Sequence, residues 1–545
     1  MTTFKTQFSI LQANATKAPS LAALKIPHYG SKGPYWKDIS YSTLFSDVEM
    51  AASFWADRLH REGVQSGSVI GVWVKGTSYG DLVHVWGLSR SGFIPQLFSL
   101  RMTDPSVVYE LLKKAGAVAL LHDASYESFL HDSPVLTIPA GNIPRITDSS
   151  SQPLLPPICE SSNAEDVSMI FHTSGSTSGV PNLVPITVQW LDALFSKIPH
   201  FSRFIPVPEK QEVMTAVGSF MHMGSNLCIW KTIVLGGCLV LPTDIPYSAT
   251  ELSRIIVECG LTKLVMFPPL LSIVFRQADK DPLLLERLQK LHAVIYAGMA
   301  LNATDERWAH DKGICPVNLY GSTETGFAMC SGSTVETSSY LKPFPGSIYE
   351  FIPLQDGVDS DVKLLELTIP PESPECPVDS LRSSDGKFHT GDLFIEAEPG
   401  RYVSKGRADN WIKMQMGLRC DTGSIEANAL QTCAGDLIHT VVVVGAGRPS
   451  PVMVVEPRDE ISCADDGRLS HTQVDQLSKE VLQRITPFHQ RRYKHERIDD
   501  AQFILVVQKG SLPRTTTKGN IRRKEVEHML KDQLDQVFCM NPTRG

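Results

Sequence analysis

A run of hydroxyl residues and glycines, His-Thr-Ser-Gly-Ser-Thr-Ser-Gly at 172–179, directly follows the apolar stretch 167–171. Glycine lets the backbone turn tightly and approach a ligand closely. Successive N–H groups in such a turn form an anion site, to which Ser and Thr hydroxyls add donors. The run is therefore a candidate polyphosphate loop. It is not a Walker A loop, because Val180 stands where that motif needs Lys. Considered alone, the run is explained equally well as a polar surface turn.

Two acidic residues lie in similar polar motifs further along the chain. Glu324 follows Thr323 in Asn-Leu-Tyr-Gly-Ser-Thr-Glu-Thr at 318–325. A buried glutamate needs a partner, and Mg²⁺ with phosphate oxygens is one possibility. A helix N-terminus with a Ser/Thr cap explains this motif equally well. Asp392 lies in Phe-His-Thr-Gly-Asp-Leu-Phe at 388–394, where its carboxylate would accept the two hydroxyls of a ribose. The alternative for Asp392 is a turn aspartate.

The periodicity of apolar residues predicts a series of alternating helices and strands. Segment 44–62 has helical spacing and stops at Gly63, segment 68–74 is typical of a buried strand, and 81–88 of the next helix. Further strand or helix signals follow at 117–122, 167–171, 188–195, 236–241, 264–267 and 293–296. This alternation predicts an α/β architecture with largely parallel sheets. Segment 346–399 is more typical of a β-rich module, and a separate unit begins near residue 410.

Composition narrows the classes of function. At 545 residues, with 42% hydrophobic and 20% charged residues, the chain is expected to form a soluble protein of two or more domains. The net charge of -8 offers no basic stripe for a nucleic-acid backbone, so nucleic acid is not an expected partner. No segment has the length of a membrane span, and the N-terminus has no secretory signal. The eleven cysteines lack zinc-ligand spacing and are expected to be reduced thiols of a cytoplasmic protein.

Two C-terminal segments complete a set of five ordered motifs. They are Gly-Arg-Ala-Asp-Asn-Trp-Ile-Lys at 406–413, and Leu-Pro-Arg-Thr-Thr-Thr-Lys-Gly-Asn-Ile-Arg-Arg at 512–523. In this order, the five motifs resemble the acyl-adenylate-forming superfamily, which includes acyl-CoA synthetases and the adenylation domains of peptide synthetases. Within it, the chain looks most similar to fungal adenylation domains of secondary metabolism. The resemblance implies a large AMP-binding domain of α/β subdomains plus a β-rich module at 1–408. It also implies a small mobile α+β domain at 409–545.

The resemblance also implies roles for individual residues. The phosphates of ATP would be held by Thr173, Ser174, Gly175, Ser176, Thr177, Ser178 and Gly179. The rest of the nucleotide site would comprise Gly298, Met299, Ala300, Tyr320, Gly321 and Ser322, with Asp392 and Arg407 at the ribose. Thr323 and Glu324 would serve phosphate and Mg²⁺. Lys518 would bridge the substrate carboxylate and the α-phosphate, Asp409 would be the hinge, and Gly417 would line a thiol tunnel.

Four positions depart from the pattern of the superfamily. The phosphate loop carries one extra residue, and Asn182 stands where a lysine is usual. Asn410 replaces the usual second aspartate after the hinge, and Lys518 precedes Gly519 where many members have the reverse order. With Asn182, this position offers no lysine for a direct charge contact to the leaving phosphates.

The resemblance implies ATP-dependent activation of a carboxylic acid as acyl-AMP, followed by transfer to the thiol of CoA or of phosphopantetheine on a carrier protein in trans. Amino-acid-activating relatives place an aspartate near the segment Ser-Phe-Met-His-Met-Gly at 219–224, which here contains no acid. An aryl or aliphatic acid without an α-amine is therefore expected, because a buried ammonium needs a counter-charge. His222, Phe267 and Met299 are candidate pocket residues, although core packing explains the last two about as well.

Other interpretations remain for single motifs and for the whole chain. Gly-Thr-Ser-Tyr-Gly at 76–80 matches the nucleophile elbow of an α/β-hydrolase, with Ser78 as the nucleophile. Segment 441–449 resembles a dinucleotide-binding turn, but a hairpin to 452–455 fits it better because Pro449 interrupts the helix start. The chain as a whole would alternatively be a degenerate nucleotide-binding protein without catalysis. It would also fit an adenylation domain excised from a longer enzyme with carrier and reductase modules.

Overall fold

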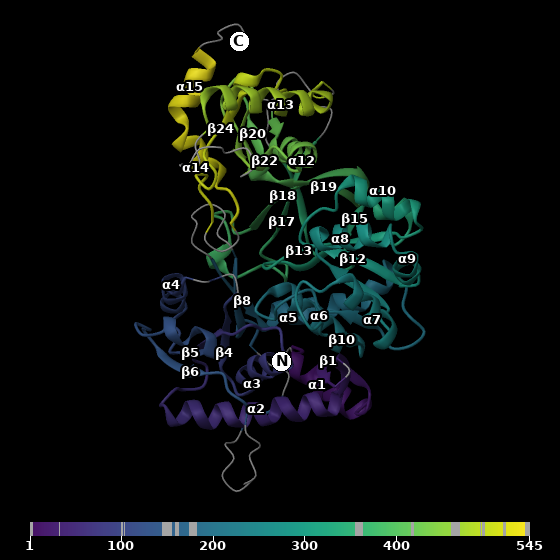
Figure 1. The fold of residues 1–545 in the computed structure, drawn as a ribbon. Coiled ribbons are helices and arrows are strands. Elements are labelled where there is room, and N and C mark those ends of the chain that lie inside the picture. Colours follow the sequence, from purple (N-terminus) through teal and green to yellow (C-terminus); the bar gives the residue numbers. More distant parts are fainter. Residues whose placement is uncertain are drawn as a thin grey trace.

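The computed structural model describes residues 4–31, 33–99, 102, 104–143, 155–158, 163–173, 182–354, 363–415, 419–458, 469–490, 492, 496–515 and 519–539. These residues form a mixed α/β protein in which a large N-terminal part carries a smaller C-terminal part, at the top of Figure 1. Within these ranges, no helix combines the length and the apolar character that crossing a bilayer requires.

The first sheet of the large part has six strands in the order β6-β5-β3-β4-β7-β8, and only the β7-β8 pair is antiparallel. Its strands are β3 (Val69–Trp73), β4 (Ile94–Leu97), β5 (Ala119–His122), β6 (Leu136–Pro139), β7 (Val167–Thr173) and β8 (Asn182–Thr187). Helices α2 (Tyr41–Arg61) and α3 (Tyr79–Arg90) cover one face, and α4 (Pro105–Ala115) covers the other. Neighbouring side chains of β3 point to opposite faces of the sheet. Val72 packs in the core with α2 and α3, whereas Trp73 packs with α4.

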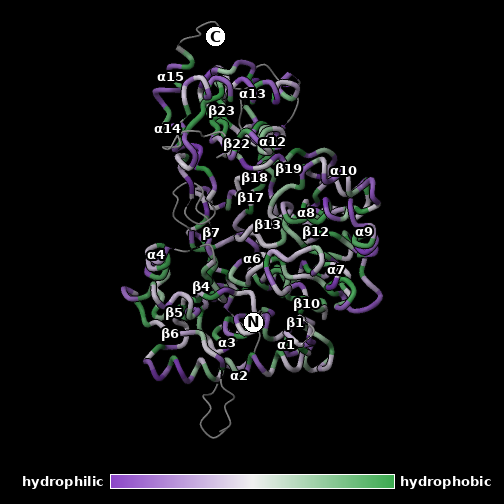
Figure 2. Tube along the Cα trace, in the orientation of Figure 1, coloured by the Kyte–Doolittle hydropathy of each residue, from purple (hydrophilic) through white to green (hydrophobic). Residues whose placement is uncertain are grey.

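Helix α2 illustrates how the local sequence determines an element. The Ser40 hydroxyl caps its first turn by accepting a bond from the Thr43 N–H, and Gly63 follows its end with a positive φ of 78°. Apolar and polar residues alternate along the helix in Figure 2, and its apolar side chains enter the core. The predicted helix at 44–62 is therefore confirmed, as are the strand at 68–74 and the helix at 81–88.

Ser78 has a structural role at the start of α3. Its hydroxyl accepts a hydrogen bond of 3.1 Å from the Asp81 N–H, and Asp81 in turn accepts from the N–H of Ser78. This reciprocal capping box explains why a serine stands between strand and helix. The geometry favours a helix cap over the nucleophile of a hydrolase.

Replacing Ser78 by alanine is therefore expected to lower the free energy of unfolding by about 1 kcal/mol, the usual cost of losing a cap. Enzymatic activity at a temperature well below the unfolding transition should be unchanged. Chemical denaturation and an activity assay of the variant test this, and an activity loss of several orders of magnitude would restore the hydrolase interpretation.

The second sheet has thirteen strands in the order β16-β17-β18-β19-β15-β14-β13-β12-β11-β9-β10-β1-β2. Its first strands in the chain are β1 (Ala22–Gly30), β2 (Gly33–Ser40), β9 (Val213–Thr215), β10 (Cys238–Val240), β11 (Lys263–Met266), β12 (Ala293–Ala297) and β13 (Pro316–Ser322). They are followed by β14 (Gly326–Ser331), β15 (Leu341–Pro343), β16 (Glu350–Pro353), β17 (Leu365–Ile369), β18 (Phe388–Glu398) and β19 (Arg401–Arg407). The run from β13 to β1 is parallel, whereas β16, β17 and β18 are antiparallel. Both the parallel sheet and the β-rich module at 346–399 are thus confirmed.

One continuous core lies between the two sheets, and a second core lies on the outer face of the large sheet. The inner core takes residues from α1 (Gln7–Lys17), α5 (Val188–Lys197) and α6 (Met223–Leu235). The outer core takes residues from α7 (Ala249–Glu258), α8 (Pro268–Ala278), α9 (Pro282–Gln289) and α10 (Ala303–Asp311). Helix α11 (Val335–Ser338) is short and lies between β14 and β15. Strand residues again alternate, with Val265 in the inner core and Leu264 in the outer one.

The C-terminal part has a hydrophobic core of its own. Its strands are β20 (Trp411–Lys413), β21 (Arg419–Asp421), β22 (Ile438–Val444), β23 (Val452–Pro457) and β24 (Ile504–Val506). Its helices are α12 (Thr422–Cys433), α13 (His471–His489), α14 (Arg523–Met529) and α15 (Lys531–Cys539). Strands β22 and β23 pair antiparallel, so the hairpin prediction is confirmed and the dinucleotide turn is excluded there.

Candidate functional site

The carboxyl ends of four neighbouring strands of the large sheet carry part of the predicted site at one edge. Strands β9, β11, β12 and β13 are adjacent and parallel. His222, Phe267 and Gly298 lie in the segments that follow β9, β11 and β12, respectively, and the motif 318–325 covers the end of β13 and the turn after it. In open α/β sheets, ligands bind outside the carboxyl ends of the strands. Along this edge, the residues predicted for the acid pocket therefore come first, on the side of β9, and the predicted nucleotide motif comes last, at β13.

The motif around Glu324 forms a tight turn between β13 and β14. The Ser322 hydroxyl accepts hydrogen bonds of 3.2 Å from the backbone N–H groups of Glu324 and Thr325. The indole Nε1 of Trp190, in α5, donates to the carbonyl oxygen of Glu324 over 3.0 Å. In the structure this motif is a β-hairpin turn. The helix N-terminus, which explained its sequence equally well, is therefore wrong. Glu324 is half-buried rather than buried, as are Thr323 and the two residues before it.

The hairpin requires glycine at position 321. A Cβ built on Gly321 would overlap the carbonyl oxygen of Gly326 on the partner strand, where backbone rather than a flexible side chain fills the space. Gly321→Ala is therefore expected to lower the free energy of unfolding by about 1–3 kcal/mol, the usual range for overpacking. It should also impair nucleotide binding, because the displaced turn carries Glu324. Thermal unfolding and ATP titration test both effects, and a variant as stable and active as the wild type would contradict this account of the turn.

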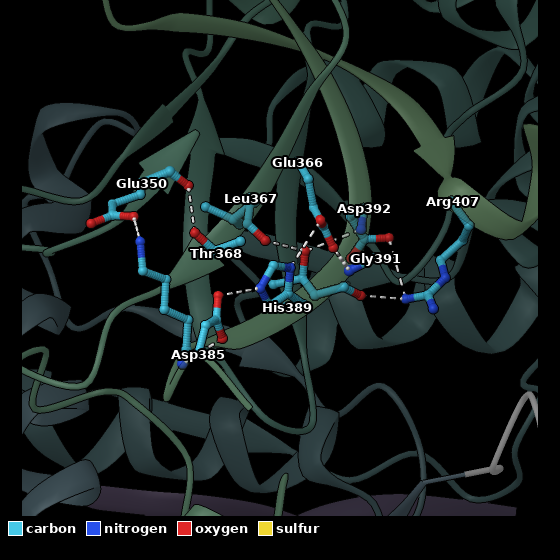
Figure 3. A network of polar contacts seen from close by, with 11 residues as sticks. Glu350, Glu366, Leu367, Thr368, Asp385, His389, Gly391, Asp392 and Arg407 are labelled. Atoms are coloured by element: carbon cyan, nitrogen blue, oxygen red, sulfur yellow. Dashed lines mark hydrogen bonds and ion pairs between the residues drawn. The ribbon is translucent and has the colours of Figure 1, made fainter. Parts of the chain in front are cut away.

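Asp392 lies inside β18, paired with Arg407 on β19, and is therefore not the turn aspartate considered above. The Tyr320 hydroxyl, from β13, donates a hydrogen bond of 2.6 Å to Oδ2 of Asp392. Nη1 of Arg407 lies 3.6 Å from Oδ1 of Asp392 and donates to the carbonyl oxygen of Thr390 over 2.7 Å. Figure 3 shows Arg407 and Asp392 pointing toward each other. Burial, and then the charge of Asp392, raises the pKa of Tyr320 well above its ordinary value, so its hydroxyl keeps its proton.

The smaller sheet meets this edge through its own carboxyl ends. Ser99 follows β4, and its hydroxyl lies 3.0 Å from Nε2 of His222, at the start of α6. Thr173 ends β7 and pairs with Asn182, the first residue of β8, so the strands close the base of the candidate phosphate loop. Residues Ser174, Gly175, Ser176, Thr177, Ser178 and Gly179 lie outside the described residues. The structure thus brings the base of the loop to the site.

His172 fixes the strand that leads into this loop. Its Nδ1 lies 2.8 Å from the carbonyl oxygen of Leu97, its Nε2 lies 3.0 Å from Nε2 of Gln96, and its ring stacks on Phe98. A carbonyl only accepts and the Gln96 amide nitrogen only donates, so the ring is neutral with its proton on Nδ1. Burial lowers the pKa of His172 to about 4, in agreement with that assignment. His172 therefore ties β7 to β4 as a neutral side chain.

The predicted acid pocket is lined by exposed apolar side chains. Phe267 is 40% exposed and Met299 is 65% exposed, which is high for such residues. The core-packing explanation of both residues is therefore wrong. Gly298, with a positive φ of 83°, holds the turn beside Phe267, and a Cβ there would lie 3.4 Å from the Phe267 ring. The carboxyl edge thus carries exposed apolar surface at Phe267 and Met299 as well as the polar contact between His222 and Ser99.

The link between the two parts runs through a short 3₁₀ turn, η5 (Ala408–Asn410), which contains Asp409. The Thr422 hydroxyl donates to the carbonyl oxygen of Asn410 over 2.6 Å, and Nη1 of Arg523 lies 3.3 Å from its side-chain oxygen. Asn410 is thus bound to the C-terminal part immediately after the predicted hinge. Gly417 and Lys518 lie outside the described residues, although Thr515 and Gly519, on either side of 516–518, are hydrogen-bonded over 3.0 Å.

Several residues with polar contacts in or beside the predicted motifs were not anticipated from the sequence. They are Ser99, Trp190, Glu366 and His389. Glu366 was detectable as a lone acid in the apolar run 364–369, and His389 stands inside the Asp392 motif itself. No local signal marks Ser99 or Trp190, because their contacts lie 123 and 134 residues away in the chain.

Comparisons with known proteins agree with this geometry. A family profile described as AMP-binding enzyme matches residues 11–350, and one described as AMP-binding enzyme C-terminal domain matches 409–541. The AMP-binding domain-containing enzyme iboA of Amanita muscaria is 33% identical over 521 residues, which cover 93% of this chain and 98% of iboA. The adenylate-forming reductase stbB of Stachybotrys bisbyi is 23% identical over 85% of this chain, which spans only 42% of the length of stbB.

Solved structures share the fold. The o-succinylbenzoate CoA synthetase MenE from Bacillus subtilis, in complex with the acyl-adenylate intermediate OSB-AMP, superposes with a TM-score of 0.71. The match covers 95% of this chain and 97% of MenE at 16% identity. The same enzyme in complex with ATP and magnesium ion gives a TM-score of 0.70 at 16% identity. Taken with the two profile matches and the identity to iboA, these findings show that the chain belongs to the family of AMP-binding enzymes.

Proposed function

We propose that this enzyme activates a carboxylic acid with ATP and then transfers the acyl group to a thiol. In the first step, a carboxylate oxygen attacks the α-phosphorus of ATP, the bond to the leaving phosphate breaks, and acyl-AMP and pyrophosphate form. In the second step, the sulfur of CoA or of a phosphopantetheine arm attacks the acyl carbonyl, and AMP leaves. Both steps bring charged groups together, so catalysis depends mainly on positioning and on charge neutralisation.

One observation carries the proposal, namely the joining of Asp392 and Tyr320 at the carboxyl edge of the parallel strands. An ionised carboxylate has about four acceptor sites on its two oxygens, and Tyr320 uses one of them on Oδ2. Two neighbouring hydroxyls, as in ribose, can both donate hydrogen bonds to the oxygens of one such carboxylate. We assign Asp392 and Arg407 to the ribose, and Tyr320 with Gly298, Met299 and Ala300 to the adenine side.

The acidic turn fits a magnesium nucleotide better than a metal cage. Within the described residues, no group of three or more His, Cys, Asp or Glu side chains is placed to hold a metal ion. Mg²⁺ is usually bound through one or two carboxylates together with substrate phosphates, so Glu324 alone meets this requirement. We assign Glu324 to Mg²⁺, which would neutralise phosphate charge there, and Thr323 to a phosphate oxygen. The loop 173–179 would hold the β- and γ-phosphates.

We assign the remaining roles to the C-terminal part. Lys518 would supply positive charge between the substrate carboxylate and the α-phosphate. Rotation about Asp409 would then present the face that contains Gly417 to the incoming thiol. The separate hydrophobic core of residues after 410 supports such a division into a large domain, 1–408, and a small domain, 409–545.

The proposed acid is aryl or aliphatic and has no α-amine. No Asp or Glu occurs in the segment 219–224, and the apolar surfaces of Phe267 and Met299 are exposed. His222 and Ser99 would meet a polar group on the acid. The fungal relatives iboA and stbB support a role in secondary metabolism, with a carrier protein in trans as one form of the thiol acceptor.

The experiment that tests the proposal is ATP–pyrophosphate exchange across a panel of aryl, polyketide-like and fatty acids. We expect exchange that depends on both Mg²⁺ and one class of acid, with no exchange when the acid is omitted. Thioester formation is then measured with CoA and with a phosphopantetheinylated carrier. An enzyme that exchanges pyrophosphate with no acid of the panel, or only with amino acids, would contradict the proposed substrate class.

A second candidate function is nucleotide binding without catalysis. Asn182 favours it, because this neutral and exposed residue lies opposite Thr173 where relatives have a lysine. The same exchange assay separates the two candidates. Binding of ATP without any acid-dependent pyrophosphate release would support the second.

A further inference from the structure

His389 is held between two carboxylates on the same sheet as Asp392. Its Nδ1 lies 3.0 Å from Oε2 of Glu366, on β17, and its Nε2 lies 3.0 Å from Oδ2 of Asp385, in the turn before β18 (Figure 3). Ionised carboxylates accept hydrogen bonds and cannot donate them. A neutral imidazole has only one N–H, so one carboxylate would face a lone pair. Only the doubly protonated imidazolium satisfies both partners.

Glu366 also binds the backbone next to Asp392. Oε1 of Glu366 accepts a hydrogen bond of 3.1 Å from the N–H of Gly391. Here β18 forms a bulge, since Thr368 pairs with His389 and Glu366 pairs with Leu393, leaving three residues opposite one. Gly391 has a positive φ of 70°, which favours glycine. The bulge therefore turns at Gly391, and Asp392 is its last residue.

The hydrogen bonds of the bulge converge on Asp392. The Thr390 hydroxyl donates to the carbonyl oxygen of Leu367 over 2.8 Å, and the N–H of Asp392 lies 3.1 Å from that hydroxyl. Arg407 reaches the Thr390 carbonyl, and a Cβ on Gly391 would lie 3.0 Å from its Nη2. The contact between Glu366 and Gly391 thus ties a carboxylate that also binds His389 to the backbone of the bulge.

The charges around His389 favour its protonated form. Asp385 and Glu366 face the ring, Lys387 is paired with Glu350 of β16 over 2.5 Å, and the positive charge nearest the bulge is that of Arg407. Burial opposes the charge of the ring, but the hydrogen bonds that the ring donates to Asp385 and Glu366, together with the charges of these carboxylates, outweigh it and raise the pKa of His389 above its ordinary value of 6.5. The hydrogen bond from His389 likewise lowers the pKa of Asp385.

We propose that His389 is a positioning residue for the nucleotide: as an imidazolium it holds Glu366 against Gly391, and so fixes the bulge that presents Asp392 to the ribose. This inference rests on the proposed function, because it takes Asp392 as the ribose ligand. It predicts that the affinity for the ribose falls as the pH rises. The raised pKa belongs to the folded protein, so positioning is lost as the pH passes upward through that folded pKa, which lies above the ordinary value of histidine.

The test measures binding of adenosine from about pH 6 to about pH 9, a range that spans the titration of histidine. Adenosine keeps the ribose but has no phosphates whose own titration would obscure the profile. The wild type is expected to lose about tenfold in affinity across this range, the effect of weakening one charge-assisted hydrogen bond. Dideoxyadenosine, which lacks the 2′ and 3′ hydroxyls, should bind more weakly and show no such pH dependence.

Two variants identify His389 as the origin of the profile. His389→Gln should bind adenosine about tenfold more weakly at low pH, with a flat profile, because glutamine has no charge. His389→Arg keeps a permanent cation with several N–H donors, so it should restore affinity and remain flat up to high pH. Lys387→Gln removes a neighbouring cation that does not contact Glu366 or Gly391, and it should retain the wild-type profile.

The outcomes separate this inference from the proposed function. Wild-type protein that binds neither ATP nor adenosine at any pH would overturn the proposed function. Wild-type binding with a pH profile identical to that of His389→Arg, or an unchanged profile in His389→Gln, would overturn the role of His389 alone. If His389→Gln does not fold, the comparison of wild type with His389→Arg still decides the question.

Discussion

Lys518→Ala is expected to lower the rate of acyl-adenylate formation by about 10²–10³, the usual cost of removing one preorganised charge from a reaction that develops negative charge. ATP should still bind, since the residues assigned to ribose and adenine lie in the other part of the chain. The measurements are acid-dependent pyrophosphate exchange and, separately, ATP binding by calorimetry.

The control for this variant is Lys524→Ala, which removes an exposed lysine on the nearby helix α14. It should leave both measurements unchanged. Wild-type exchange in Lys518→Ala would refute the assignment and would direct attention to another cation.

Asp392→Ala is expected to raise the KM for ATP and to lower kcat/KM by about 10²-fold. The variant loses the proposed acceptor for two ribose hydroxyls and leaves the Tyr320 hydroxyl without its partner at 2.6 Å. Hydrogen bonds to a charged group are worth about 1.5–3 kcal/mol each, and a change of about 2.7 kcal/mol corresponds to this factor. Steady-state kinetics with varied ATP, at a saturating concentration of the acid, provide the measurement.

Glu396→Gln serves as the control on the same strand, because Glu396 is an exposed residue of β18 whose carboxylate accepts a bond from the N–H of Gly400. It should leave the KM for ATP unchanged. A second readout is binding of dideoxyadenosine, which Asp392→Ala should affect far less than binding of adenosine. Equal losses for the two ligands would indicate that Asp392 acts on stability rather than on the ribose.

The segments that local periodicity singled out each contain a helix or a strand. The helix at 44–62, the strands at 117–122 and 293–296 and the hairpin after 441 all occur where their patterns indicate. The spacing of apolar residues along one face and the capping residues both lie within a few consecutive positions. They therefore predict the same element in any fold that buries that face. The local sequence did not determine the structure of the motif containing Glu324, because Ser-Thr-Glu-Thr can cap a helix or close a hairpin equally well. Its antiparallel pairing with β14 decided between the two.

The chemistry of the site was predictable only as a set of separate motifs. The sequence offered hydroxyls and glycines, two carboxylates and a lysine, each in a context with an ordinary structural explanation. It placed Phe267 and Met299 equally well in a core, whereas the structure exposes both. The role of the phosphate loop, of Lys518 and of Gly417 stays a prediction, because these residues lie outside the described ranges.

By itself, the sequence determined the kinds of groups available and the elements that carry them, since propensity, capping and amphipathicity act over a few residues. The tertiary structure decided which groups meet. Tyr320 bonds Asp392 across 72 residues, and His389 reaches Glu366 across 23, because strand order and the bulge in β18 place them side by side. Those contacts depend on the packing of the whole sheet, and no short segment of the chain encodes them.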